Sequence, residues 1–542
     1  MLLRFVTLVC LLLAVPVLGV LGSWLMFDAG GLSTLRQQWQ TVLPEYALNS
    51  ALLAVGVGIG VAILGGATAA AVSLFEFPLR RFFEWALLLP LAMPAYVLAY
   101  AYTDFLQFSG PLQTGLRAAT GLQGALWPDV RSLPGAVALF VLSLYPYVYL
   151  LTRAALGERA VPLMEAARLL GAGTARRVRE VALPLARPAL AAGVALALME
   201  TLADYGVGSY FGLATVTTGI YKAWLVMNDR IAAAQLASLL LAGVGLLLWL
   251  EHRAQRRLRF AAGRRGAEHG AEARPLALHG AAAAFAAGMC ALPVLLGFVL
   301  PVAVLLRLMA LESQAAGALS GPGWLRFVHW GWTSLKLAAL AAVLALALAL
   351  ALSFARRLRT GGLLRWAARV VALGYAVPGA VIAVGILLPL GWLQAAAPAA
   401  GGATMLVTGT MFGLLYAYLV RFSAVALQSV ESGYARVPAS VDETARMLGV
   451  SRRRLFVELH APLLRRSALA ATLLVFVDVM KELPATLLLR PFDSDTLAVV
   501  AYQLARDERL GEAALPSLAI VAVGLVPVLL LSRAMRGSSG AA

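Results

Sequence analysis

The sequence has little charge and almost no cysteine. Of its 542 residues, 13% are charged and 61% are apolar, whereas soluble domains carry about 25% charged residues. A chain of soluble domains is therefore excluded, and a protein with many membrane-spanning segments is indicated. The two cysteines, Cys10 and Cys290, lie inside apolar runs. This excludes a disulfide framework and a cysteine-based metal cluster.

The sequence also lacks the glycine-rich loop that binds nucleotide phosphates. Its only lysines are Lys222, Lys336 and Lys481, and none of them follows a glycine. The motif G-x-x-x-x-G-K-[ST] is therefore absent. The five histidines show no metal-ligand spacing, and no nucleophile constellation is present. We therefore expect a protein that is not an enzyme, and any ATP hydrolysis that its function needs must occur in a separate subunit.

Twelve windows are long and apolar enough to cross a bilayer, which takes about 20 residues. They lie near 5–27, 47–74, 84–103, 134–151, 188–210, 231–250, 276–306, 331–355, 370–393, 404–430, 467–489 and 513–532. The first is longer than the roughly 7–15 apolar residues of a signal peptide, so a retained span is favoured over a cleaved one. The sequence predicts an all-α membrane protein with about 12 transmembrane helices.

The basic residues predict the orientation of these spans. With the N-terminus in the cytosol, most of the 44 lysines and arginines fall on the cytosolic side, with Arg421 counted there as lying near a helix end. This distribution follows the positive-inside rule. We expect both termini to be cytosolic and a multi-pass protein in contact with membrane lipid. The net charge of +17 then requires no nucleic-acid partner.

The chain contains an internal repeat. Residues 165–184, EAARLLGAGTARRVREVALP, recur as ETARMLGVSRRRLFVELHAP at 443–462, and MPAYVLA at 93–99 matches VPGAVIA at 377–383. Each half holds six predicted spans, an even number, so the two halves have the same orientation and form parallel six-helix repeats. The predicted boundaries are a first repeat at 1–251, a basic cytosolic linker at 252–275 and a second repeat at 276–542.

The two repeated loops have the features of docking segments. Each begins with strong helix formers, and Gly171 or Gly449 is expected to end that helix in a left-handed conformation. Small side chains would let a partner approach closely, and His460 is expected on the same surface. Interfacial loops without a partner are the alternative, but recurrence in both halves favours docking. The predicted docking residues are Glu165, Ala166, Ala167, Gly171, Glu443, Thr444, Ala445 and Gly449.

At these residues the chain resembles the permeases of bacterial ABC importers. Glu165-Ala166-Ala167 with Gly171 matches the Glu-Ala-Ala loop of that family, and the second copy departs mildly at Thr444 and Ala461. The segments 199–224 and 477–499 are similar to the fused, twelve-helix permeases for ferric iron.

The resemblance implies a type I ABC-importer permease fold in the bacterial inner membrane. It also implies docking to two copies of an ABC ATPase and delivery of substrate by a periplasmic binding protein. This chain would bind no cofactor itself, since ATP and Mg would be held by the partner ATPase.

Two pairs of carboxylates lie within the predicted spans, where a charge costs about 2.5–3.5 kcal/mol on insertion scales. Glu200 and Asp204 are four residues apart, as are Asp478 and Glu482, and both pairs are separated by 278 residues. Helical spacing would place each pair on one helix face. Carboxylate oxygens suit a hard cation, so we predict a transient Fe³⁺ pathway at these four residues. The alternative is that they are helix-end carboxylates paired with Lys481 or Arg490.

Other transport functions stay open. Related permeases carry thiamine, polyamines or sulfate, and a proton-coupled secondary transporter would use the carboxylates as a proton relay. The two docking loops argue against a secondary transporter. Two further motifs predict local structure: Gly56 and Gly60 favour close helix packing, and Pro94 and Pro378 predict broken helices that line the pathway.

Overall fold

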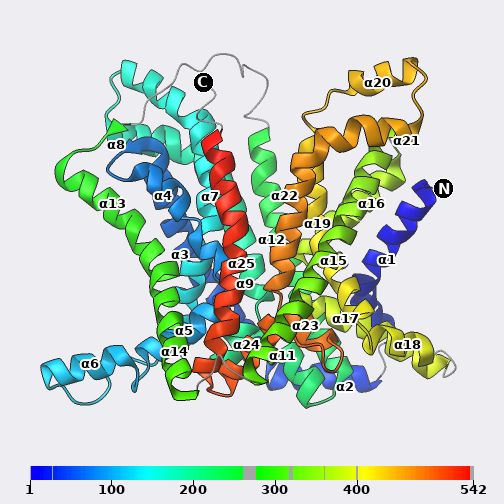
Figure 1. Cartoon of the computed structure of the whole chain (residues 1–542), viewed down its shortest axis with the longest axis horizontal. Helices are drawn as coiled ribbons and strands as arrows, with labels where there is room; N and C mark the ends of the chain where they lie inside the picture. Colours follow the sequence, from blue (N-terminus) through cyan, green and yellow to red (C-terminus); the bar gives the residue numbers. More distant parts are fainter. Residues whose placement is uncertain are drawn as a thin grey trace. The chain divides into compact units, whose positions relative to one another are not determined.

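The protein is almost entirely helical. The computed structural model describes residues 2–26, 29–259, 276–316, 322–358, 361–397 and 401–537. Within these ranges the only strands are β1 (Phe75–Glu76) and β2 (Leu276–Ala277), which pair in parallel, and all other regular structure is helical (Figure 1). The predicted all-α membrane class is confirmed.

The number of spans is slightly lower than predicted. Ten helices among the described residues are long and apolar enough to cross a membrane, or eleven if a bent pair is counted as one span. That pair, Arg80–Ala92 with Ala95–Thr120, turns by 90°. The predicted window at 467–489 is the one without a matching span, because helix α22 (Ala461–Met480) carries two arginines and an aspartate within its 20 residues.

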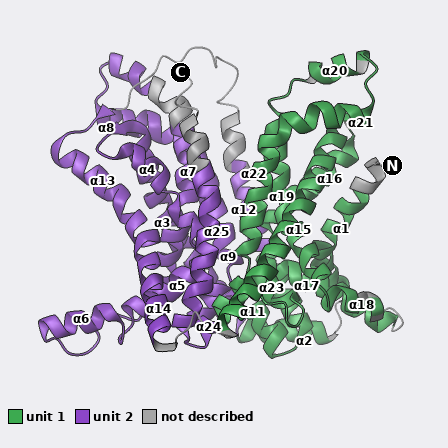
Figure 2. Ribbon diagram, in the orientation of Figure 1, with its two compact units in different colours: residues 1–41, 219–241, 318–503 green, residues 42–218, 242–317, 504–542 purple. Residues whose placement is uncertain are grey.

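Contacts divide the chain into two compact units, each formed by three segments (Figure 2). Unit 1 comprises residues 1–41, 219–241 and 318–503, and unit 2 comprises residues 42–218, 242–317 and 504–542. The helices within unit 1 are α1 (Leu2–Gly22), η1 (Ser23–Met26), α2 (Ala29–Gln40), η4 (Lys222–Val226), α15 (Pro322–Leu358), α16 (Gly362–Leu373), η6 (Gly374–Ala376), α17 (Gly379–Ala396), α18 (Gly401–Thr408), α19 (Met411–Tyr434), α20 (Ala439–Met447), α21 (Arg452–Arg454), η8 (Leu455–His460), α22 and α23 (Pro484–Leu489).

Unit 2 contains the corresponding helices of the first half together with the chain's last helix. They are α3 (Leu43–Leu74), α4 (Arg80–Ala86), η2 (Leu89–Ala92), α5 (Ala95–Leu106), α6 (Pro111–Thr120), α7 (Leu133–Leu169), α8 (Thr174–Arg177), η3 (Val178–Ala182), α9 (Leu183–Ala203), α10 (Gly206–Tyr210), α13 (Gly280–Val294), η5 (Leu295–Val299), α14 (Leu300–Ala316) and α25 (Leu510–Gly537). Three helices run across the unit boundaries: α11 (Val216–Tyr221), α12 (Arg230–Arg259) and α24 (Leu497–Arg506).

Each unit has a core of three packed helices. In unit 2, α3 packs on α7 and α9, and in unit 1, α15 packs on α19 and α22. The internal repeat relates α7 to α19 and α9 to α22, so both cores use equivalent helices. A matching hydrogen bond supports the equivalence. Ser50 Oγ accepts from the Val216 amide at 3.0 Å, and Ser334 Oγ accepts from the Leu497 amide at 2.8 Å.

Glycines allow α3 to approach α7 closely. A Cβ atom built on Gly60 would lie 2.3 Å from Val141 Cγ2, and one on Gly56 would lie 3.0 Å from Val137 Cγ2. Only a residue without a side chain fits at Gly60. In a bilayer, where lipid is as apolar as leucine, close packing of this kind is a main source of helix association. The prediction made for this pair of glycines is confirmed.

The first span of each half packs within the unit formed mainly by the other half. Helix α1 packs on α16 and α17 in unit 1, while α14 packs on α25 and α5 in unit 2. The compact units therefore combine segments of both sequence halves. The repeat boundaries at 1–251 and 276–542 stay a prediction. Of the predicted linker at 252–275, the start belongs to α12, and residues 260–275 lie outside the described residues.

Two prolines break helices at equivalent places. Pro94 precedes α5 with φ −59° and ψ 141°, and Pro378 precedes α17 with φ −58° and ψ 142°. In both cases a short 3₁₀ helix, η2 or η6, ends just before the proline. The predicted helix breaks are confirmed, whereas the position of these prolines on a transport pathway stays a prediction.

Candidate functional site

The first repeated loop begins as the end of a long helix. Helix α7 runs for 37 residues and carries Glu165 to Ala167 in its last turns. Gly171 then adopts φ +83°, and the Ala172 amide donates to the Ala167 carbonyl at 3.0 Å. This six-residue closure, with glycine in the left-handed region, is the Schellman ending of a helix.

The second loop ends in the same way but begins differently. Gly449 has φ +68°, and the Val450 amide donates to the Ala445 carbonyl at 3.0 Å. Here, however, the Glu443-containing segment forms a separate helix, α20, after α19 has ended at Tyr434. Pro438 lies in the break, where its missing N–H prevents a continuous helix. The predicted roles of Gly171 and Gly449 as helix-ending residues are confirmed.

An exposed apolar pair lies just before the glycine in each loop. Leu169 and Leu170 are 90% and 88% exposed, and their counterparts Met447 and Leu448 are 89% and 76% exposed. The flanking Glu165, Ala166, Glu443 and Thr444 are also exposed. Large apolar side chains this exposed, at equivalent places in two loops, mark a contact surface for a partner.

The second loop is fixed to the membrane helices by a buried polar network. Arg357 of α15 donates from Nε to Asp442 Oδ2 at 2.5 Å, and from Nη2 to the Val437 carbonyl at 2.7 Å. His460 Nε2 lies 2.7 Å from Asp442 Oδ1, and its Nδ1 lies 3.1 Å from the Tyr434 hydroxyl. The network therefore ties α20 to α15, α19 and η8.

Two opposing effects act on the pKa of the Asp442 carboxyl. Burial alone would raise it, but hydrogen bonds and charge from Arg357 and His460 favour the carboxylate, and the net pKa is lower than the ordinary value of aspartic acid. Asp442 is therefore ionised at neutral pH and accepts from both partners. His460 itself is 0% exposed, so its predicted place on the docking surface is wrong: it supports the loop from beneath.

The first loop has apolar residues at the equivalent positions. Asp442, His460 and Tyr434 correspond, 278 residues earlier, to Met164, Ala182 and Leu156. These three form a buried apolar cluster with Leu74 and Ala186. One docking loop is thus anchored by packing and the other by charged hydrogen bonds.

The second carboxylate of each predicted pair caps a short helix. Helix α9 ends at Ala203, and Asp204 Oδ1 accepts from the Val207 amide in the first turn of α10 at 2.8 Å. Helix α22 ends at Met480, and Glu482 accepts from the amide of Ala485 in the first turn of α23 at 2.8 Å. The members of each pair therefore do not share one continuous helix face, because the helix ends between them.

The other members of the pairs lie within the membrane helices. Asp478 Oδ1 is 2.9 Å from Lys481 Nζ, the pairing considered as the alternative to an iron pathway. Glu200 lies half-buried near the end of α9. In the part of the chain that the structure describes, no group of three or more His, Cys, Asp or Glu side chains could hold a metal ion. The role of the four carboxylates in iron passage stays a prediction.

The family is decided by two matches along the chain. Residues 58–260 and 346–538 both match the model of the binding-protein-dependent transport system inner membrane component. The chain belongs to this family. Each match contains one docking loop and one carboxylate pair, so the duplication inferred from the sequence is a duplication of the family's domain. As a member with ten or eleven apolar spans, this permease is a multi-pass inner membrane protein.

Relatives of two sizes resemble this permease. The Fe(3+)-transport system permease protein FbpB 2 of Haemophilus influenzae is 25% identical over 499 residues, covering 91% of this chain and 90% of that protein. A protein of Salmonella typhimurium that bears the name 2-aminoethylphosphonate transport system permease protein PhnV is 27% identical over 251 residues, covering 44% of this chain and 88% of that protein. The first relative matches both repeats, and the second has about the length of one.

The sequence analysis misplaced one charged residue of this permease. Arg421 was expected near a cytosolic helix end, but it lies inside α19 and is buried. Its Nη1 is 3.4 Å from Glu482 Oε1. A buried arginine is stable only when it is paired, and the pairing joins α19 to the loop before α23. An arginine within the otherwise uncharged segment 411–430 is the sequence signal that indicates such a partner.

Proposed function

We propose that this permease is the membrane subunit of an ATP-driven importer of ferric iron. The observation that carries the proposal is the similarity to the Fe(3+)-transport permease, which extends over nine-tenths of both chains. Family membership supports import that depends on a binding protein, and disfavours a proton-coupled secondary transporter. A periplasmic binding protein would deliver the iron, and the termini would be cytosolic.

We further propose that two copies of an ATPase subunit dock on the two loops. Each copy would receive Leu169 and Leu170, or Met447 and Leu448, in an apolar groove beside the exposed Glu165 or Glu443. The equivalent helix endings at Gly171 and Gly449 support equivalent docking. ATP and Mg would belong to the ATPase, and this chain would hold no cofactor.

The two loops would pass movement to the pore by different routes. Helix α7 is continuous from the docking residues into the membrane, so displacement of Glu165 moves the whole helix. Helix α20 is separate, and its displacement reaches α15 through the bonds between Arg357 and Asp442. Closure of the ATPases on ATP would rock the two repeats and open the pathway outward, and hydrolysis would reset it.

Along that pathway we propose transient contacts between Fe³⁺ and the four carboxylates. Glu200, Asp204 and Asp478 are all partly accessible, and Glu482 is buried against Arg421. Carboxylate oxygens are the ligands that a hard cation prefers. Replacing all four by Asn or Gln and finding unchanged iron uptake would contradict this part of the proposal.

Uptake of radioactive ferric iron tests the proposal in cells that lack the gene. We expect the wild-type gene to restore ATP-dependent uptake, and the double variant Glu165→Arg/Glu443→Arg to fail. Glu180→Arg is a matched control, since Glu180 is an exposed carboxylate that pairs only with Arg176 among the described residues. Restoration of full uptake by the double variant would remove the coupling assignment, and normal iron uptake in the deletion strain would point to another cargo.

The second candidate is import of a small organic solute. The similarity to the 2-aminoethylphosphonate permease favours it, although that match covers 44% of this chain. The same strains would be tested with labelled 2-aminoethylphosphonate, and then with thiamine, polyamines and sulfate. Uptake of one of these solutes, without uptake of iron, would replace the iron assignment and leave the coupling assignment intact.

A further inference from the structure

A cavity of about 400 Å³ lies in unit 1 beside the second docking loop. It is formed by the ends of α15 and α19 and the start of α16. Its polar and aromatic lining consists of Ser353, Arg356, Arg357, Arg365, Glu431 and Tyr434. A volume of this size is within the usual range for small-molecule sites, about 300–1,000 Å³.

The donors around this cavity exceed the acceptors. Arg356 pairs with Glu431, and Arg357 is bound to Asp442, but each guanidinium has five N–H donors and keeps some of them. Arg365 has no side-chain hydrogen bond or ion pair to any residue in the described ranges.

A buried hydroxyl also faces the cavity without a partner. Ser353 is 5% exposed and lines the cavity, yet its Oγ makes no hydrogen bond to a described residue. A buried hydroxyl left unbonded costs about 1–3 kcal/mol, so a ligand that accepts its proton would remove a penalty. This observation is independent of the arginines.

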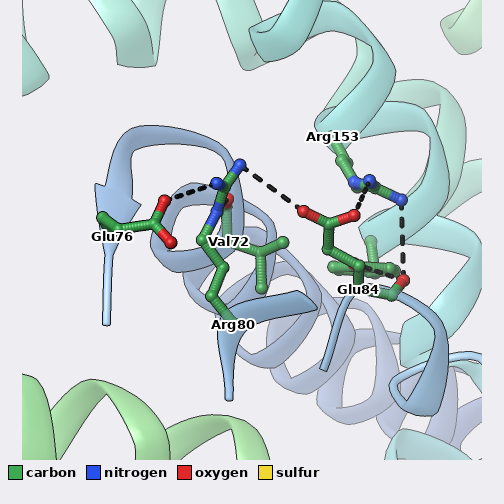
Figure 3. Close-up of polar contacts among 6 residues, drawn as sticks. Val72, Glu76, Arg80, Glu84 and Arg153 are labelled. Carbon is green, nitrogen blue, oxygen red and sulfur yellow. Dashed lines mark hydrogen bonds and ion pairs between the residues drawn. The ribbon is translucent and has the colours of Figure 1, made fainter. Parts of the chain in front are cut away.

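The equivalent place in the first half is neutralised by the protein itself. There Glu84 lies between two arginines: Oε1 is 3.5 Å from Arg80 Nη2, and Oε2 is 3.0 Å from Arg153 Nη2 (Figure 3). By the offset of 284 residues, Glu84 corresponds to Ala368 in the second half. The second half therefore has no acid at that position and presents an excess of guanidinium groups instead.

We propose that this cavity binds the phosphate group of a small phosphate ester. Planar guanidinium groups match phosphate oxygens in two-point hydrogen bonds, the Ser353 hydroxyl supplies a further donor, and the Tyr434 ring offers an apolar wall for the organic part. The ester is either a soluble metabolite or the headgroup of an anionic phospholipid, which basic pockets at membrane surfaces also bind. Binding by this chain does not depend on iron being the cargo.

Direct binding to the purified full-length protein tests the proposal. One arm titrates glycerol 3-phosphate in detergent by calorimetry, and the other measures phosphatidylglycerol retained from mixed nanodiscs by native mass spectrometry. We expect saturable binding in one arm, weakened at least tenfold in Arg365→Gln and also weakened in Ser353→Ala. Arg369→Gln, one turn further along α16 and outside the lining, is the control and should bind as the wild type does.

The two arms separate the source of the phosphate. Binding of the free ester assigns a soluble ligand, and binding of phosphatidylglycerol alone assigns a lipid headgroup. Because Arg365 is exposed and makes no described contact, its variant should keep the wild-type thermal unfolding temperature. Affinity weaker than about 1 mM in both arms, or equal binding by the wild type and Arg365→Gln, would overturn the proposal.

Discussion

At the scale of single residues, the exposed apolar pairs of the docking loops are the most direct targets. Burial of one leucine contributes about 1.5–3 kcal/mol, so Leu170→Asp or Leu448→Asp should weaken ATPase binding by roughly tenfold or more. Because both side chains are almost fully exposed, permease stability should not change. Co-purification with the ATPase, beside a Leu122→Asp control in an exposed loop, measures the effect. Undiminished co-purification of the variants would contradict docking at these residues.

Asp442 should give the second loop a pH-dependent stability. Its pKa is lowered in the folded state, so its stabilising contribution is complete above the unfolded value of about 3.9 and is lost as the pH falls through the folded value. Asp442→Asn should therefore lower the unfolding temperature at pH 7, at a cost of about 1–3 kcal/mol, with a gap that closes below pH of about 4. The groups that face it are Arg357, His460 and Tyr434.

The first loop provides the control for this pH effect. Met164 occupies the place equivalent to Asp442 within an apolar cluster, so Met164→Ala should lower stability by a similar amount at every pH. Thermal unfolding of the purified permease between pH 3 and 8 distinguishes the two variants. A gap for Asp442→Asn that stays constant across this range would show that the carboxylate charge does not hold the loop.

At the scale of helices, the contact between α3 and α7 depends on one glycine. A side chain at Gly60 would meet Val141 at 2.3 Å, and α3 and α7 could then separate only by losing their interface. We expect Gly60→Leu to lower folded yield and unfolding temperature by the 1–3 kcal/mol typical of overpacking, or more. Gly245→Leu in α12, where nothing lies within 4 Å, is the matched control. Equal stability of the two variants would contradict close packing as the source of association.

Sequence patterns predicted helices well where one physical rule dominated. Apolar length identified the spans, Gly171 and Gly449 identified two helix ends, and Pro94 and Pro378 identified two breaks. The same rule failed at α22, whose charged residues shorten its apolar part. It also missed Arg421, because a window average does not show that a single charge is buried against Glu482.

The site was predicted less completely because tertiary contacts decide what each side chain does. Glu200 and Asp204 read as one helix face, but α9 ends between them and Asp204 caps α10 instead. Equivalent positions in the two loops also differ in chemistry, Met164 in one and Asp442 in the other. The repeat signal therefore predicted where the loops are, while their anchoring required the packed structure.

At the scale of the whole molecule, the exchange of first spans makes the two halves depend on each other. Helix α1 belongs to the unit that contains α16 and α17, and α14 belongs to the unit that contains α5. Half-length relatives such as the 2-aminoethylphosphonate permease must gain the equivalent contacts from separate chains if they share this arrangement. Fusion of the halves replaces that association by a covalent link and raises the effective concentration of one half for the other.

A split permease tests this dependence. If the chain is divided between Arg259 and Leu276, we expect the two halves to co-purify and to restore transport when they are expressed together, because every packing contact can still form. Expressed alone, each half lacks helices that its unit needs, so it should be degraded or aggregated. A deletion variant without residues 2–26 should lose stability, since α16 and α17 then expose the surface that α1 covers. A first half that is stable and monodisperse by itself would show that the exchanged spans contribute little to folding.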